Sequence, residues 1–107
     1  MKQKTPCPVA ALARDARRLE TECCNADEAG DRALSDKAER RLNATRAAIS
    51  HLDPKSATGA RYQLELIEVY ADALIDGEQD TQYDRFHAIQ RMTGAVSKFL
   101  AAELSSR

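Results

Sequence analysis

The sequence predicts an all-α protein, an antiparallel four-helix bundle with up-down-up-down order. Two observations support this fold class. Ala is common, Arg outnumbers Lys, and the 107 residues include only 4 Gly and 3 Pro, a composition that favours helices. Apolar residues also recur at spacings of three and four in four stretches of similar length, and the short connections between them favour antiparallel neighbours.

The first helix is expected from Pro8 to about Glu28. Pro8 suits the first helical turn, where its missing N–H is no loss, and Gly30 is a natural stop. Residues 1–7 are expected to form a flexible N-terminal tail, and residues 8–107 a single helical-bundle domain. Apolar and small residues form a narrow seam along this helix: Val9, Leu12, Ala16, Leu19, Cys23 and Ala26.

The second helix can begin at either of two capping residues, Asp31 or Ser35. It is expected to end at Asp53, because the residue before Pro54 is pushed out of the α region. Its apolar seam runs through Leu34, Ala38, Leu42, Thr45, Ile49 and Leu52.

The third helix, about 57–76, is predicted to be the central one. Ser56 is its expected cap, and Gly77 its C-terminal signal. Its apolar arc spans roughly 240°, whereas a surface helix usually shows a stripe of somewhat over 100°. One apolar stripe contains Leu64, Ile67, Ala71 and Leu74. The other contains Tyr62, Leu66, Val69, Tyr70 and Ala73.

The fourth helix is expected to run to about Leu104. The segment from Thr81 to Asp84 loosely matches a capping box, with Asp in place of Glu. The apolar face of this helix contains Phe86, Ile89, Met92, Val96, Phe99, Leu100 and Leu104.

The two halves of the chain differ in apolar content, and this difference suggests a function. Large aliphatic residues are few before Pro54, whereas the second half has about twice as many and all the Tyr and Phe residues. The thin first hairpin then leaves apolar surface on the third helix uncovered, and such surface usually marks an interface. A homodimer through this helix is the leading hypothesis, with Tyr62, Leu66, Val69, Tyr70 and Ala73 as the interface. A monomer with both stripes covered, and an adaptor for an unknown protein partner, are the alternatives.

A metal-binding bundle is an alternative from a different functional class. Its ligands would be Glu65, Glu68, Asp84 and His87. Di-metal bundles use two Glu-x-x-His pairs and two further Glu residues, most of which are missing here. The acidic strip of Glu65, Glu68, Asp72 and Asp76 is therefore interpreted mainly as a solvent-facing strip.

No catalytic arrangement of residues can be identified, so the sequence predicts a non-enzymatic protein with no cofactor. The three cysteines, Cys7, Cys23 and Cys24, lack paired zinc spacings and do not indicate a disulfide framework. Cys23 lies on the first seam, whereas Cys24 lies beside it. His51 resembles a phosphotransfer histidine only superficially, because Pro54 follows too closely.

The charge pattern excludes two classes of partner. The formal net charge is −1, whereas nucleic-acid binding and attraction to anionic lipid need a basic surface. The start of the chain is too short and too interrupted by proline for a signal peptide, and no apolar run approaches about 20 residues. The sequence therefore predicts a cytoplasmic protein without nucleic-acid or membrane partners.

Overall fold

The structure, a computed structural model, describes residues 6–76 and 79–106. Four helices make up nearly all of this part of the chain, which contains no strand, so the predicted all-α class and helix count are confirmed. The helices are α1 (Pro8–Ala29), α2 (Arg32–Ile49), α3 (Ala57–Asp76) and α4 (Gln79–Ser105).

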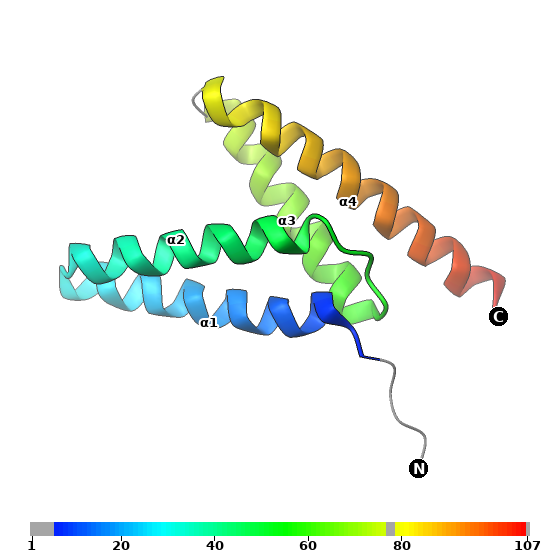
Figure 1. Cartoon of the computed structure of the whole chain (residues 1–107), viewed down its shortest axis with the longest axis horizontal. Coiled ribbons are helices and arrows are strands. Elements are labelled where there is room, and N and C mark those ends of the chain that lie inside the picture. The colour runs from blue at the N-terminus through cyan, green and yellow to red at the C-terminus, as the bar shows by residue number, and fades with distance from the viewer. Residues whose placement is uncertain (1–5, 77–78, 107) are drawn as a thin grey trace, which may run out of the picture.

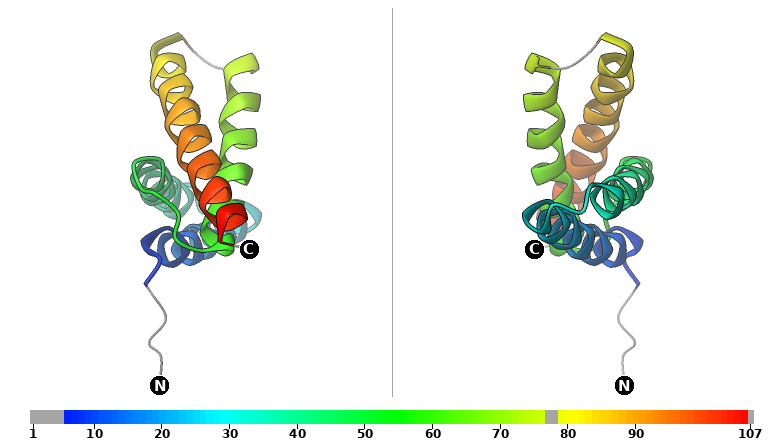
Figure 2. Two further views of the ribbon diagram at one scale, coloured as in Figure 1. Left: turned by 90° about the vertical axis from the view of Figure 1, so that its right-hand side faces the viewer. Right: turned by 90° about the vertical axis from the view of Figure 1, so that its left-hand side faces the viewer.

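The helices pair into two antiparallel hairpins, α1–α2 and α3–α4, which cross each other (Figure 1). Figure 2 views α1 and α2 nearly end-on while α3 and α4 rise away from them. The principal extents of the Cα trace are 50 × 38 × 16 Å, and the shortest of these leaves room for about two helix layers. Because the hairpins cross, the predicted up-down-up-down order is not confirmed.

The turn between α1 and α2 uses the signals that the sequence predicted. Gly30 adopts a left-handed conformation with φ of 72°, which glycine tolerates without a Cβ penalty. The Asp31 N–H bonds to the Ala26 carbonyl at 2.9 Å, and the Gly30 N–H bonds to the Asp27 carbonyl at 3.1 Å. This pair of bonds is a Schellman motif. Of the two predicted caps, Asp31 caps α2, because its carboxylate accepts from the Leu34 N–H at 3.1 Å.

The α2–α3 connection differs from the prediction at its start. Helix α2 ends at Ile49, not at Asp53, and the chain continues through tight turns before Pro54. The Gln63 side chain stabilises this early end, since its Nε2 donates to the carbonyls of Ile49 at 3.1 Å and Leu52 at 2.7 Å. Ser56 caps α3 as predicted, accepting from the Gly59 N–H at 3.1 Å.

The start of α4 corrects a second boundary. The helix begins at Gln79, two residues before Thr81, so the predicted capping box is not the helix start. Gly77, the predicted stop signal of α3, lies outside the described residues. The α3–α4 pair is held in register where the Gln82 amide donates to the Leu74 carbonyl at 3.1 Å.

One hydrophobic core joins all four helices. Helix α3 lies against both α1 and α4, as expected for a central helix. The core residues share low exposure and mutual contact: Val9, Ala13, Ala16, Leu19, Leu42, Ile49, Tyr62, Leu66, Ala88 and Met92. Leu34, predicted on the α2 seam, is instead 51% exposed near the tip of the α1–α2 hairpin.

Cys7 is part of the folded region, whereas the sequence assigned it to a flexible tail. Its side chain packs against the core, and its Sγ accepts from the Lys55 N–H at 3.4 Å. A Cβ added at Gly59 would lie 2.9 Å from the Cys7 Sγ and 3.2 Å from the Val9 Cβ. The absent side chain of Gly59 therefore lets the start of α3 approach the start of α1 closely.

The helices show no membrane-spanning character. Across the described part of the chain, none is long and apolar enough to cross a bilayer.

Candidate functional site

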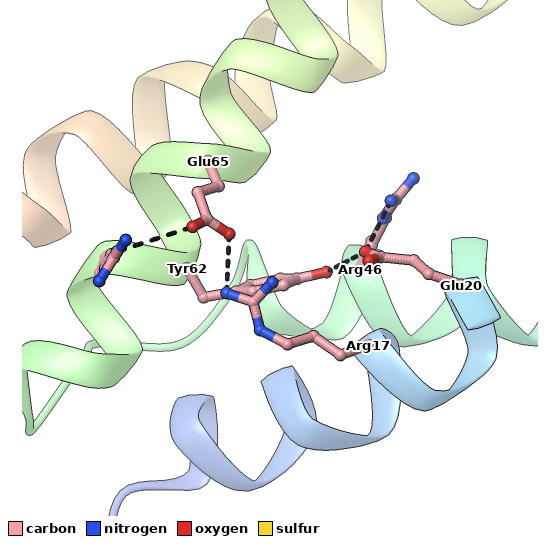
Figure 3. A network of polar contacts seen from close by, with 6 residues as sticks. Arg17, Glu20, Arg46, Tyr62 and Glu65 are labelled. Atoms are coloured by element: carbon pink, nitrogen blue, oxygen red, sulfur yellow. Dashed lines mark hydrogen bonds and ion pairs between the residues drawn. The ribbon is translucent and has the colours of Figure 1, made fainter.

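The most ordered polar cluster lies where α1, α2 and α3 meet (Figure 3). The Tyr62 hydroxyl on α3 donates to Glu20 Oε1 on α1 at 3.2 Å. The same oxygen accepts from Arg46 Nη2 on α2 at 3.0 Å. One carboxylate therefore connects three helices.

A second carboxylate extends the cluster toward solvent. Arg17 Nη2 on α1 pairs with Glu65 Oε2 on α3 at 2.8 Å, and Arg61 Nε approaches the other oxygen at 3.7 Å. The Arg17 guanidinium also lies over the Tyr62 ring, 5.2 Å from its centroid, a cation–π geometry. The acidic strip predicted on α3 is thus partly neutralised, and it contributes to the contact between the two hairpins.

Burial changes the proton affinities in this cluster. Burial raises the pKa of Tyr62. Burial opposes the charge of Arg46, yet its hydrogen bonds to Tyr62 and Glu20 outweigh that effect and raise its pKa. Among the described residues, the Arg46 Nε has no hydrogen-bond partner. Each of the two carboxylates in the cluster is paired with a guanidinium, and the contacts of Glu20 and Glu65 link α1 to α3 where the hairpins cross.

The structure reverses the predicted roles of the two α3 stripes. Tyr62 and Leu66, predicted at the interface, are only 3% and 1% exposed because α1 packs against them. Val69 is 41% exposed, and Tyr70 and Ala73 are half-buried. The prediction that Tyr62 and Leu66 are accessible interface residues is therefore wrong. The stripe predicted to face the core contains Leu64, which is 50% exposed.

The exposed side of α3 continues onto α4. On α3, Leu64, Ala71 and Ile75 are exposed at spacings of seven and four, on one helical face. Half-buried Leu74 lies against α4, where it lines a shallow pocket with Gln82, Tyr83 and Phe86.

On α4, the face buried against the core carries Ala88, Met92 and Val96. Phe86, Leu100 and Leu104 were predicted on the same apolar face, but they are 50%, 49% and 72% exposed. They lie on a different flank of α4 from Ala88, Met92 and Val96, and Phe86 lines a shallow pocket with Leu74 of α3.

We call these six residues together the outer face of the α3–α4 hairpin, turned away from the α1–α2 hairpin: Leu64, Ala71, Ile75, Phe86, Leu100 and Leu104.

The predicted metal ligands are not assembled into a site. Glu65 is paired with arginines, Glu68 and Asp84 are exposed, and the His87 ring contacts the Tyr83 ring at 4.3 Å between centroids. Within residues 6–76 and 79–106, no group of three or more His, Cys, Asp or Glu side chains could hold a metal ion. The metal alternative therefore gains no support from the geometry.

The cysteines and His51 occupy separate places. Cys7, Cys23 and Cys24 are free thiols. Burial works to raise the pKa of the Cys7 thiol, but hydrogen bonds from the Ser56 hydroxyl and from neighbouring backbone N–H groups lower it overall. Cys23 contacts the Ser35 hydroxyl at 3.7 Å, and Cys24 and His51 are exposed.

Sequence reasoning missed the outer face because the whole apolar stripe of α4 was assigned to the core. One signal was available. Phe86, Leu100 and Leu104 lie on a different side of the helical wheel from Ala88, Met92 and Val96, so one packing partner could not cover both sets.

Comparison with known proteins adds no assignment. No protein-family model matches the sequence, and searches of curated proteins and of solved structures find no significant similarity.

Proposed function

We propose that this chain is a non-enzymatic helical interaction protein that self-associates through the outer face of the α3–α4 hairpin. The observation that carries the proposal is the gathering of exposed apolar side chains on this face. Leu64, Ile75, Phe86, Leu100 and Leu104 are between 49% and 81% exposed, and exposed apolar side chains gathered on one hairpin are typical of an interaction surface.

The crossing of the hairpins explains why the surface stays open in one chain. Helix α1 packs against the Tyr62 and Leu66 side of α3, so the α1–α2 hairpin cannot also reach the opposite side. Leu64 and Ile75 are therefore left to solvent, at 50% and 81% exposure. Covering them with a second copy would remove apolar area from water. Each Å² buried in this way stabilises the pair by roughly 25 cal/mol.

The proposal keeps self-association on α3 but changes the residues involved. The outer face takes the place of Tyr62 and Leu66 as the interface, and the interface now includes residues of α4. The test is the solution mass by light scattering over a concentration series, for the unaltered protein and for Leu100→Glu. We expect a mass that rises toward two chains for the former and the mass of one chain for the latter.

A matched control separates interface from general surface effects. Leu34 is 51% exposed, against 49% for Leu100, but it lies on the other hairpin. Leu34→Glu should therefore associate like the unaltered protein. A mass of one chain at every concentration of unaltered protein would overturn the proposal, as would equal loss of association in both variants.

A further inference from the structure

Along α4, exposed residues recur at regular spacings over more positions than the exposed apolar residues alone. Six exposed positions recur at spacings of four and three: Phe86, Gln90, Thr93, Ser97, Leu100 and Leu104. We call this set the α4 seam. Its spacing is that of a heptad repeat, and the 18 steps from Phe86 to Leu104 extend about 27 Å at 1.5 Å per step.

The α4 seam carries no charged residue, although 31% of the chain is charged. Of the exposed residues beside it, Tyr83, Gly94 and Ala101 are uncharged as well, and Glu103 near its C-terminal end is the charged one. The basic residues Arg91 and Lys98 lie on the opposite flank, where Arg91 Nε donates to the Ser50 carbonyl at 3.2 Å. Two copies of a charged stripe meeting about a two-fold axis would place like charges together, which is unfavourable. An uncharged stripe can face its own copy.

The order of residues along the seam is compatible with antiparallel pairing. Large apolar side chains stand at both ends, Phe86 at one and Leu100 with Leu104 at the other, and uncharged polar residues lie between them. A two-fold axis near Ala95 would bring Phe86 against Leu104 of a second copy. The same axis would bring the Thr93 and Ser97 hydroxyls together, so each would gain a hydrogen-bonding partner.

Near the proposed axis, Gly94 would allow the two α4 helices to approach closely. Gly94 has open space where a Cβ would stand, and glycine inside a helix is unfavourable by about 1 kcal/mol unless packing requires it. From the Gln82–Leu74 bond, ten residues back along α3 and ten forward along α4 bring Leu64 level with Met92. Leu64, which is 50% exposed, therefore lies on α3 at about the height of the middle of the seam.

From these observations we infer that two copies of the chain pair antiparallel along the α4 seam, with the two-fold axis near Ala95. This inference rests on the proposed self-association and names its geometry. The seam with its neighbours has fewer residues than the roughly 20–30 per partner of a standard interface. The pairing is therefore a concentration-dependent equilibrium between one chain and two.

Disulfide trapping tests the geometry separately from the mass. Phe86→Cys and Leu104→Cys are made in the full chain with Cys24→Ser, which removes the exposed native thiol. The two proteins are oxidised mildly, each alone and as an equimolar mixture. Antiparallel pairing predicts a cross-linked species mainly in the mixture, because identical positions lie about 27 Å apart in the pair.

The outcomes distinguish the two proposals. A dimer by light scattering with cross-linking enriched at least several-fold in the mixture supports both. A dimer in which Phe86→Cys cross-links to itself overturns the antiparallel seam and leaves self-association standing. A dimer with no cross-link in any sample, while Leu100→Glu is a folded dimer by circular dichroism and mass, overturns both the seam and the outer face as the interface and leaves self-association elsewhere standing. A single-chain mass for the unaltered protein overturns both.

Discussion

The Tyr62 hydroxyl and the Glu20 carboxylate are joined at 3.2 Å across the point where α3 crosses α1. Arg46 reaches the same carboxylate oxygen from α2 at 3.0 Å. This shared oxygen adds a polar link between three helices to the apolar packing at the crossing.

Removing the hydroxyl tests how much this contact contributes. Tyr62→Phe keeps the ring in the core and the Arg46–Glu20 pair intact, so only the contacts of the hydroxyl with Glu20 and Arg46 are lost. We expect the free energy of unfolding to fall by about 0.5–1.5 kcal/mol, measured by urea denaturation. Tyr83→Phe is the control, since Tyr83 is 72% exposed and its substitution should leave stability within about 0.5 kcal/mol.

Two glycines should respond to alanine in opposite directions. At Gly59 the added Cβ would meet Cys7 and Val9 at 2.9 and 3.2 Å, and such overpacking is unfavourable by about 1–3 kcal/mol. At Gly94 nothing lies within 4 Å, so the helix propensity of Ala should stabilise α4 by up to about 1 kcal/mol. Thermal unfolding of dilute, monomeric protein measures both. A stabilising Gly59→Ala would contradict the close approach of α1 and α3.

The two leucines on opposite sides of α3 provide a test of which stripe faces the core. Leu66 is 1% exposed and Leu64 is 50% exposed. Leu66→Glu would bury an unpaired carboxylate and should abolish cooperative folding, because such burial is strongly unfavourable. Leu64→Glu should retain the helical circular dichroism spectrum and the cooperative transition. A folded Leu66→Glu variant beside an unfolded Leu64→Glu variant would restore the arrangement that the sequence suggested.

Alkaline pH should weaken the fold through two tyrosines. Burial raises the pKa of Tyr62 and of Tyr70, although nearby arginine charges partly offset the effect at Tyr70. The folded state then holds these protons more tightly than the unfolded state, so stability falls as pH rises above the unfolded value of about 10.

Urea denaturation between about pH 8 and pH 11, in a Cys7→Ser background, measures this dependence. The double variant Tyr62→Phe, Tyr70→Phe should show a shallower decline. An equal slope in both proteins would show that the tyrosines do not carry it.

The thiol of Cys7 should ionise more easily than an ordinary cysteine. Hydrogen bonds from Ser56 and from backbone N–H groups outweigh the opposing effect of burial and lower its pKa. The pH dependence of alkylation, followed at Cys7 by mass spectrometry, should therefore have a midpoint below the usual value of about 8.5. Ser56→Ala should move that midpoint upward, and an unchanged midpoint would contradict the role of the hydroxyl.

Most of the secondary structure could be predicted because its signals are local. Gly30 and Ser56 mark helix ends through their own backbone and side-chain chemistry, and the structure retains both. The end of α2 could not be predicted in this way. It depends on Gln63, which lies 14 residues from Ile49 along the chain and whose side-chain Nε2 donates to the Ile49 carbonyl.

The candidate surface was harder to predict for a related reason. The sequence showed that α3 has two apolar stripes, but the choice of the buried one depends on where the other hairpin crosses. The contacts of Arg17 with Glu65 and of Tyr62 with Glu20 join α1 to α3 at that crossing, and no local pattern encodes these long-range pairs. The stripe of α4 was assigned to one face because the crossing was unknown.

The Schellman turn at Gly30 also bears on how the molecule opens. Amide protons at the tip of the α1–α2 hairpin are protected mainly by this local turn and by small side chains such as Ala26 and Ala38. Amides near Leu19, Ile49 and Leu66 lie in the shared core. Deuterium should therefore enter the tip of the α1–α2 hairpin early and the crossing last, so exchange would move inward along this hairpin toward the core.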